Sequence, residues 1–223
     1  MKALAWKELR EVLIIVVAAL AWYLALTVSA MGSKAFNWVP LMPRGAYGIP
    51  FVDEGNFAAL HSFISGIFAV VLGFRQSAWE SSRGTYLFLL HRPIRRETVF
   101  LIKLATGSAV YLLCASLPIL LYTWWAILPG HHTGPFEWSM TGAAWRMTFL
   151  MLLLYLGAFL SGLRSARWFG TRLLPLAGSL MLLVLGNTLP ASKWWYLGFP
   201  LALALCAVLI SNIFFVARVR DYA

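Results

Sequence analysis

The chain has 223 residues, of which 61% are hydrophobic and 12% are charged, and its mean hydropathy is +0.77. This charged fraction is about half that of an ordinary soluble domain, which excludes a soluble globular protein and indicates an integral membrane protein. Because a helical span needs roughly 20 mostly apolar residues, the chain has room for about six spans and for no sizeable soluble domain. The net charge of +10 suits anionic lipid head groups and gives no reason to expect nucleic acid as a partner.

Residues 1–11 are too polar to cross a bilayer, but their apolar side chains recur with helical spacing. The apolar positions that share one face are Ala5, Trp6, Leu9, Val12 and Leu13. Charged side chains fall on the other face. This pattern predicts an amphipathic helix that lies on the membrane surface before the first span, and a frayed cationic tail is the alternative.

Six apolar runs, bounded by charged residues, proline or glycine, predict membrane spans. The runs cover residues 12–31, 57–74, 100–128, 143–163, 173–189 and 194–216. The first run is too long for a secretory signal and is followed by no persuasive small-residue cleavage site, so we expect it to be retained. The predicted fold is therefore all-α, with residues 1–223 forming a single transmembrane domain.

Lys and Arg residues predict the orientation, because they resist translocation across the membrane. If both termini are cytoplasmic, 14 of the 18 Lys and Arg residues lie on the inner side. Only Lys34, Arg44, Arg146 and Lys193 remain outside. We therefore predict a multi-pass protein with cytoplasmic N- and C-termini in the cell membrane, with a bacterial inner membrane as the natural expectation.

Few residues are suited to chemistry within the spans. Cys114 and Cys206 lie inside apolar runs, so we expect neither a disulfide framework nor a cysteine metal site. No Asp or Glu lies deep in a predicted span, and His131 and His132 in an outer loop have no evident third ligand. We predict no catalytic residue and no metal site in this chain, which also disfavours a lipid-modifying enzyme.

The connection at residues 75–98 is longer than a simple chain reversal requires. Trp79, Arg83, Tyr86, Leu87 and Leu90 share helical spacing, and a proline ends the run. We expect a short amphipathic helix over residues 85–91 whose apolar side chains fit a groove in a protein partner. Binding of inner-leaflet lipids is the alternative, although charges of both signs around the helix favour protein docking.

This stretch resembles the first cytoplasmic loop of type-two (ABC-2-like) ATP-binding cassette transporter permeases. The matching residues are, in chain order, Glu80, Gly84-Thr85, Phe88-Leu89-Leu90, Pro93-Ile94, Arg96 and Lys103. In that family these residue types recur between the second and third spans. The predicted six spans, surface helix and inner termini extend the resemblance from residues 80–103 to the whole chain.

The resemblance implies that the loop holds a coupling helix, which sits in a cleft of a separate ATPase subunit and transmits its movement to the spans. The residues from Tyr86 to Leu90 would form the docking knob, and Pro93 would set its exit angle. The implied ATPase-coupling residues are Glu80, Gly84, Thr85, Tyr86, Leu87, Phe88, Leu89, Leu90, Arg92, Pro93 and Arg96. Glu80, Arg92 and Arg96 would position the knob.

The sequence lacks the Gly-x4-Gly-Lys-Ser/Thr pattern that cradles nucleotide phosphates. We therefore expect this chain to bind no cofactor, and ATP and magnesium to be held by the partner ATPase subunit. Family members are half-transporters, so the resemblance further implies a second permease copy, or a related permease, and two ATPase subunits.

The polar positions of interest in the predicted spans two and five are His61, Ser62, Ser65, Asn187 and Thr188. Three of them, His61, Ser65 and Asn187, are the candidate route residues. In similar permeases these spans line the translocation route at the dimer interface, so we expect the three residues to face that route. Ordinary interhelical hydrogen bonding, typically worth about 0.6 kcal/mol, is the alternative.

Because the predicted spans hold so few polar groups, we expect a hydrophobic translocation route for a small amphipathic molecule, a lipid, a peptide or a drug. The sequence therefore predicts the permease subunit of an ATP-driven exporter, which is not itself an enzyme. The alternative is a non-transporting membrane scaffold that recruits a cytosolic partner through residues 75–98.

Overall fold

The computed structural model describes residues 2–33, 35, 49–51, 55–82, 95–130, 135–164, 171–188 and 193–219. Within these ranges the chain is helical and contains no β-strand, as the sequence predicts. The long helices are α1 (Lys2–Ala30), α2 (Gly55–Ser82), α4 (Arg96–Ile127), α5 (Gly142–Leu163), α6 (Leu174–Thr188) and α8 (Phe199–Val219). Two 3-10 turns, η2 (Trp138–Thr141) and η3 (Thr171–Leu173), precede α5 and α6, and a π-helical turn, η4 (Trp194–Gly198), precedes α8.

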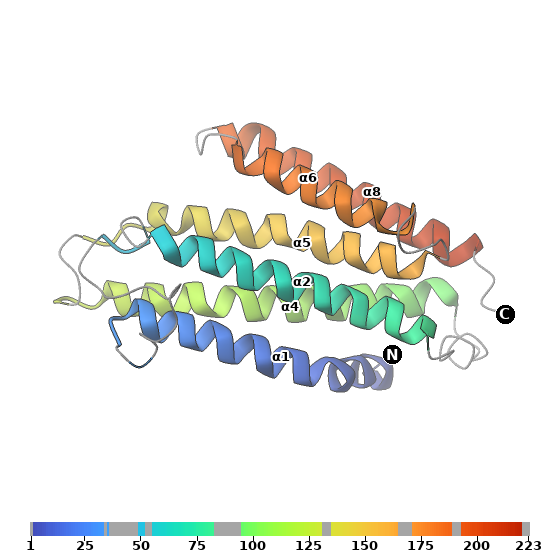
Figure 1. Cartoon of the computed structure of the whole chain (residues 1–223), viewed down its shortest axis with the longest axis horizontal. Helices are drawn as coiled ribbons and strands as arrows, with labels where there is room; N and C mark the ends of the chain where they lie inside the picture. Colours follow the sequence, from blue (N-terminus) through green and yellow to red (C-terminus); the bar gives the residue numbers. More distant parts are fainter. Residues whose placement is uncertain are drawn as a thin grey trace.

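The six long helices, some together with their preceding turns, are long and apolar enough to cross a membrane, which confirms the prediction of six long apolar helices. Consecutive helices run in opposite directions along one bundle (Figure 1). As a result, the start of α1, the end of α2, the start of α4 and the end of α8 lie together at one end of the bundle. We call this the termini end, and the other the opposite end.

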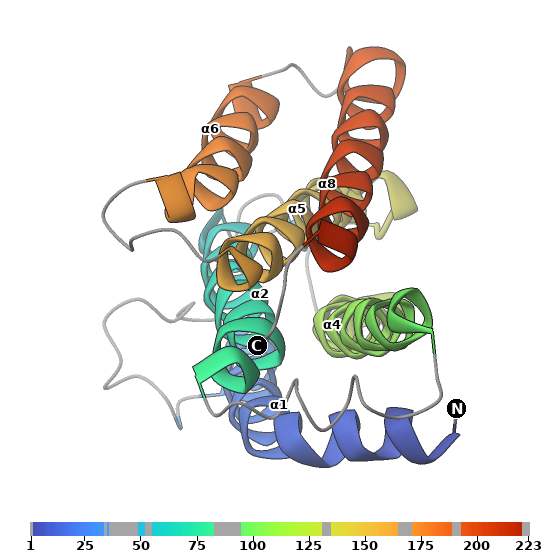
Figure 2. The same cartoon turned by 90° about the vertical axis from the view of Figure 1, so that its right-hand side faces the viewer.

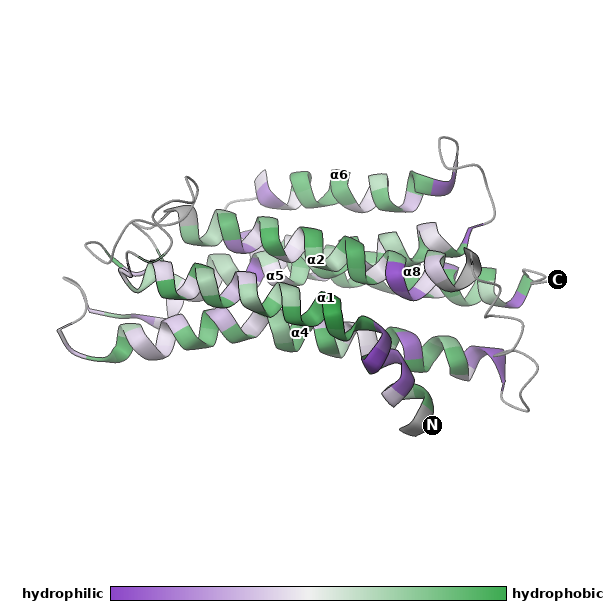
Figure 3. Ribbon diagram, turned by 60° about the horizontal axis from the view of Figure 1, so that its bottom comes forward, coloured by the Kyte–Doolittle hydropathy of each residue, from purple (hydrophilic) through white to green (hydrophobic). Residues whose placement is uncertain are grey.

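Hydropathy varies along the bundle. Hydrophobic residues dominate the middle of the helices, whereas hydrophilic residues gather around the termini end (Figure 3). Cationic residues of the described helices and turns near this end are Lys7, Arg10, Arg75, Arg95, Arg96, Lys103, Arg164, Arg172 and Arg218. Arg146 and Lys193 lie toward the opposite end, at the start of α5 and before α8.

Helix α1 changes direction after its first turns, which cross the termini end of the bundle before the helix continues along it (Figure 2). These first turns bury Leu4, Glu8 and Val12, which are spaced four residues apart on one face. Trp6 and Arg10 are exposed. The buried face thus differs from the predicted apolar face, because packing against α4 encloses a carboxylate and leaves the indole outside.

Helix α2 lies at the centre of the bundle and packs most extensively against α5 (Figure 1). Gly73 makes this close approach possible, since a Cβ atom there would lie 2.7 Å from the Tyr155 carbonyl oxygen and 2.9 Å from the Ala158 side chain. Small residues at such crossings let helices in membranes pack backbone to backbone.

Two helices extend beyond the predicted spans. Helix α2 continues to Ser82 rather than ending near residue 74, and α4 begins at Arg96 rather than near residue 100. The connection predicted over residues 75–98 is therefore helical at both ends. Polar side chains do not interrupt backbone hydrogen bonding, and the Arg75 guanidinium lies 4.7 Å from the centre of the Trp79 ring one turn later. The helix predicted over residues 85–91 lies outside the described residues.

Helices α6 and α8 lie on one side of α5 and stand apart from each other when the bundle is viewed along its length (Figure 2). They are far less buried than α2, α4 or α5. Large apolar side chains, among them Met181 of α6 and Leu203 of α8, face outward. These two helices therefore present most of their apolar surface to the surroundings of the bundle.

Candidate functional site

The structure describes only the flanks of the predicted coupling segment. Residues 84–93, which hold most of the predicted ATPase-coupling residues, lie outside the described residues. Glu80 belongs to the last turn of α2, and Arg96 is the first residue of α4. Both helix ends lie at the termini end, close to the first turns of α1 (Figure 1). The coupling role of these residues stays a prediction.

A buried ion pair joins the first turns of α1 to α4 near this end. The Lys103 Nζ atom donates to Glu8 Oε1 at 2.7 Å, and the two side chains are 0% and 1% exposed. Leu4 lies one turn before Glu8, and Val99 lies one turn before Lys103. These two buried side chains pack together, with Ile102 against them. One helical face of α1 thus meets one helical face of α4 through an apolar contact and a charged contact.

Two further polar side chains lie deeper beside this pair. The Tyr155 hydroxyl donates to Gln76 Oε1 at 2.8 Å, inside the bundle. Both groups fill the space next to Gly107, one turn after Lys103, where a Cβ atom would collide with them. We call Glu8, Gln76, Lys103 and Tyr155 the four-helix polar cluster, because α1, α2, α4 and α5 each contribute one residue.

Such a cluster is costly to bury. Removing water from two charges costs several kcal/mol per ion, and their attraction offsets this only with close geometry and additional hydrogen bonds. Ionisable residues enclosed within membrane helices are usually kept for function. The four-helix polar cluster is therefore a candidate functional site that the sequence-based candidates did not include, apart from Lys103 as part of the family pattern.

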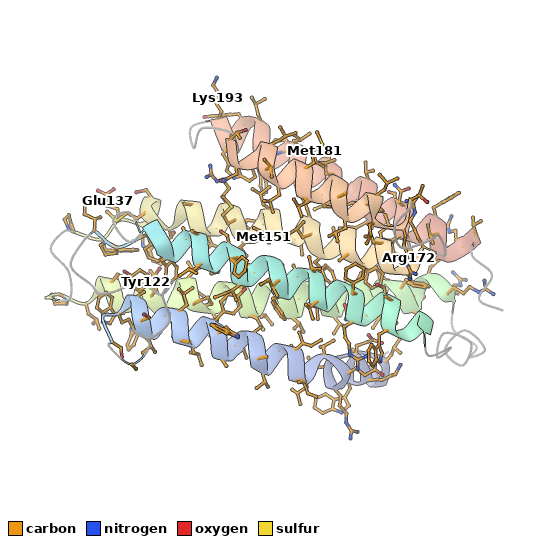
Figure 4. All side chains as sticks on the ribbon, in the orientation of Figure 1. Tyr122, Glu137, Met151, Arg172, Met181 and Lys193 are labelled. Atoms are coloured by element: carbon orange, nitrogen blue, oxygen red, sulfur yellow. The ribbon has the colours of Figure 1, made fainter. Side chains whose placement is uncertain are left out.

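Exposed polar contacts hold other helix ends together at the termini end. The Arg218 Nε atom of α8 donates to Glu97 Oε1 in the first turn of α4 at 2.8 Å. Arg172, labelled in Figure 4, donates to the carbonyl oxygens of Ser161 and Gly162 at 3.2 Å. These carbonyls belong to the last turn of α5, where intrahelical donors are missing. Arg172 thus caps the last turn of α5, and Arg218 links α8 to α4.

The predicted route residues His61 and Ser65 lie inside the bundle, both 0% exposed. The His61 Nε2 atom donates to the Ala115 carbonyl oxygen at 2.9 Å, and its Nδ1 atom has no hydrogen-bond partner among the described residues. The Ser65 hydroxyl is hydrogen-bonded to the Tyr23 hydroxyl at 2.7 Å. Both residues therefore connect α2 to a neighbouring helix, α4 for His61 and α1 for Ser65.

Asn187, the third predicted route residue, occupies a different environment. It lies near the end of α6 and is exposed, whereas His61 is enclosed between α2 and α4. The structure does not bring these residues into one site. Their role in a translocation route stays a prediction, and the interhelical hydrogen bonds of His61 and Ser65 agree with the alternative interpretation.

Among the grooves on the surface of the described residues, two lie between long helices. One, of about 530 Å³, runs between α1 and α2 and is lined only by apolar side chains such as Ile14, Trp22, Phe63 and Ile67. The other, of about 260 Å³, lies between α5, α6 and α8. His61 and Ser65 lie on a neighbouring face of α2 and do not line the larger groove.

No group of three or more His, Cys, Asp or Glu side chains suited to a metal ion occurs among the residues that the structure describes. His131 and His132 lie outside them. Comparison of the chain with protein-family models, with curated proteins and with solved structures gives no significant match. The case for a function therefore rests on the residues and geometry of this chain.

Proposed function

We propose that the chain is the transmembrane permease subunit of an ATP-driven transporter, coupled to a separate cytosolic ATPase subunit of the ATP-binding cassette type. The observation that carries the proposal is the residue pattern from Glu80 to Lys103, which resembles the coupling loop of type-two permeases. The helices on either side of residues 83–94 end at the termini end, where cationic residues gather. That arrangement suits a cytoplasmic docking site, since cationic ends of membrane helices remain inside.

The cargo we propose is a small amphipathic molecule, a lipid, a peptide or a drug, and the direction is export. The apolar groove between α1 and α2 supports a cargo with a hydrophobic part, because its lining offers no charge to bind. A second copy of this chain, or a related permease, would complete the transporter. Its place would be a cell membrane, with a bacterial inner membrane as our proposal.

The test is purification of the tagged chain from its native membrane in mild detergent, followed by identification of co-purifying chains and an ATPase assay. The variant carries Glu80→Ala together with Phe88→Ala, which removes a flanking charge and the aromatic side chain of the proposed knob. We expect the wild-type chain to retain an ATPase subunit and the double variant to lose it.

A matched control is Trp138→Ala, an exposed aromatic residue at the opposite end of the bundle, which should retain the subunit. Recovery of a monodisperse chain without any ATPase would refute the permease proposal. A different cytosolic protein bound through residues 75–98 would then support the membrane scaffold.

A further inference from the structure

We propose that Glu8 and Lys103 are positioning residues that make the first turns of α1 and the beginning of α4 move as one unit during ATP-driven coupling. Gln76 and Tyr155 support them from α2 and α5. This inference rests on the proposed function, because the movement in question is the one that the ATPase would impose. It assigns a role to a charged pair that the coupling loop itself does not explain.

The four-helix polar cluster lies close to the ends of the two helices that flank residues 83–94. Lys103 lies about two turns after Arg96, where α4 begins, and Gln76 lies within about two turns of Ser82, where α2 ends. The two helices that flank residues 83–94 therefore both contribute to the four-helix polar cluster. A displacement applied to the ends of α2 and α4 reaches this cluster within about 11 Å of helix.

Helix α1 meets α4 through its first turns. Its first turns cross the termini end instead of running along the bundle (Figure 2), so they are not held by continuous side-by-side packing of long helices. Leu4 and Glu8 contact α4 through Val99 and Lys103. Movement of α4 is therefore passed directly to α1 at this contact.

The contact between α1 and α4 combines apolar packing with an ion pair. Apolar side chains can slide past one another at small cost, because their attraction is not directional. A 2.7 Å ion pair with both side chains enclosed cannot slide without separating two opposite charges away from water. The pair therefore fixes the register between the two helices, which hydrophobic packing by Leu4 and Val99 alone does not.

The experiment measures that register directly. Spin labels are placed at the exposed positions Trp6 of α1 and Leu101 of α4, after replacement of Cys114 and Cys206 by Ala. The distance between the labels is recorded for the permease alone, and for its complex without nucleotide and with ATP trapped. We expect one narrow distance distribution in all three states.

Variants then separate positioning from stability. Glu8→Leu with Lys103→Met removes both charges while keeping the site filled, so the chain should remain folded but its label distances should broaden. Its cargo-stimulated ATPase activity should fall at least tenfold relative to the wild-type complex. The charge exchange Glu8→Lys with Lys103→Glu should restore both the narrow distance and the stimulation. Arg218→Gln, which breaks the exposed pair with Glu97, is the control and should change neither.

A wild-type label distance that shifts between nucleotide states would overturn the inference, as would full stimulation in the apolar double variant. These failures are distinct from failure of the proposed function, which would appear as absence of an ATPase subunit from the wild-type preparation. In that case the label distances of the permease alone still report whether Glu8 and Lys103 fix the register.

Discussion

Removal of one partner of the Glu8–Lys103 pair should destabilise the protein more than removal of both. Lys103→Met removes the ammonium group that lies 2.7 Å from the enclosed Glu8 carboxylate, and we expect the free energy of unfolding to fall by about 3–5 kcal/mol. The double variant Glu8→Leu with Lys103→Met buries no charge and should unfold near the wild-type value or above it. Denaturant titration of the purified protein in detergent measures the free energy of unfolding of both variants.

The control for this prediction is the exposed pair between Arg218 and Glu97, whose side chains are 66% and 50% exposed. Water screens such pairs, so Arg218→Met should lower the free energy of unfolding by no more than about 1 kcal/mol. Equal losses for Lys103→Met and Arg218→Met would show that burial of the first pair does not determine its contribution.

The predicted route residues His61 and Asn187 differ in burial, so their alanine variants should differ in stability. His61→Ala removes a buried hydrogen bond to Ala115 and should lower the free energy of unfolding by about 1–3 kcal/mol, whereas Asn187→Ala at an exposed position should not. If the residues face the cargo, both variants should also reduce cargo-stimulated ATPase activity. Unchanged transport and stimulation in both variants would refute the predicted route and leave His61 as a structural residue.

The contacts of single residues were only partly predictable from the sequence. The depth of His61 was predictable from its place in an apolar run, but its contact with Ala115 depends on how α2 and α4 pack. The burial of Glu8 was less predictable from the sequence. Glu8 lies four residues from both Leu4 and Val12, and this face of α1 is buried because α4 packs against it. A carboxylate in a polar segment looks exposed until its partner, 95 residues away, is known.

At the scale of helices, close packing of α2 against α5 should depend on Gly73. A Cβ atom there would lie 2.7 Å from the Tyr155 carbonyl oxygen. A backbone atom cannot move away as easily as the end of a flexible side chain. We therefore expect Gly73→Ala to separate the two helices locally and to lower the free energy of unfolding by about 1–3 kcal/mol. Thermal unfolding in detergent measures the change.

Gly178 of α6 is the matched control, because nothing lies within 4 Å of the Cβ atom that an alanine would add there. Alanine is favoured over glycine in a helix interior by up to about 1 kcal/mol, so Gly178→Ala should be neutral or stabilising. Destabilisation by both substitutions to the same extent would mean that the helix-to-helix approach at Gly73 is not the cause.

Helix existence could be predicted from the apolar runs, and the six long helices follow them closely. The ends of the helices could not be predicted in this way. Hydropathy indicates where a helix meets an apolar environment, and not where its backbone hydrogen bonding stops. Residues 75–82 are polar in part yet continue α2. The direction of the first turns of α1 was likewise not predictable in detail, because their buried face is chosen by contacts with α4.

At the scale of the molecule, the arrangement of charges and aromatic rings agrees with six membrane crossings. Exposed tryptophans lie near both ends of the described helices, with Trp6 and Trp79 toward the termini end and Trp124 and Trp138 toward the opposite end. Indole rings favour the boundary between lipid and water. The bundle therefore exposes indole rings at both ends, as is common in proteins that span a membrane.

The orientation itself can be tested by labelling single cysteines in the Cys114→Ala, Cys206→Ala background. Glu137 and Lys193 are exposed at the opposite end (Figure 4), and Arg95 is exposed at the termini end. With cytoplasmic termini, a membrane-impermeant thiol reagent should label Glu137→Cys and Lys193→Cys in intact cells. It should label Arg95→Cys only after the membrane is permeabilised.

The same labelling bears on function, because an ATPase subunit in the cytosol can contact only the residues that face it. Labelling of Arg95→Cys in intact cells would place the ends of α2 and α4 outside, together with residues 83–94 that join them. Neither ATPase coupling nor the scaffold alternative would survive that result, since both need a cytosolic partner. Protection of Arg95→Cys, with labelling at the opposite end, would instead place the four-helix polar cluster on the side where ATP is hydrolysed.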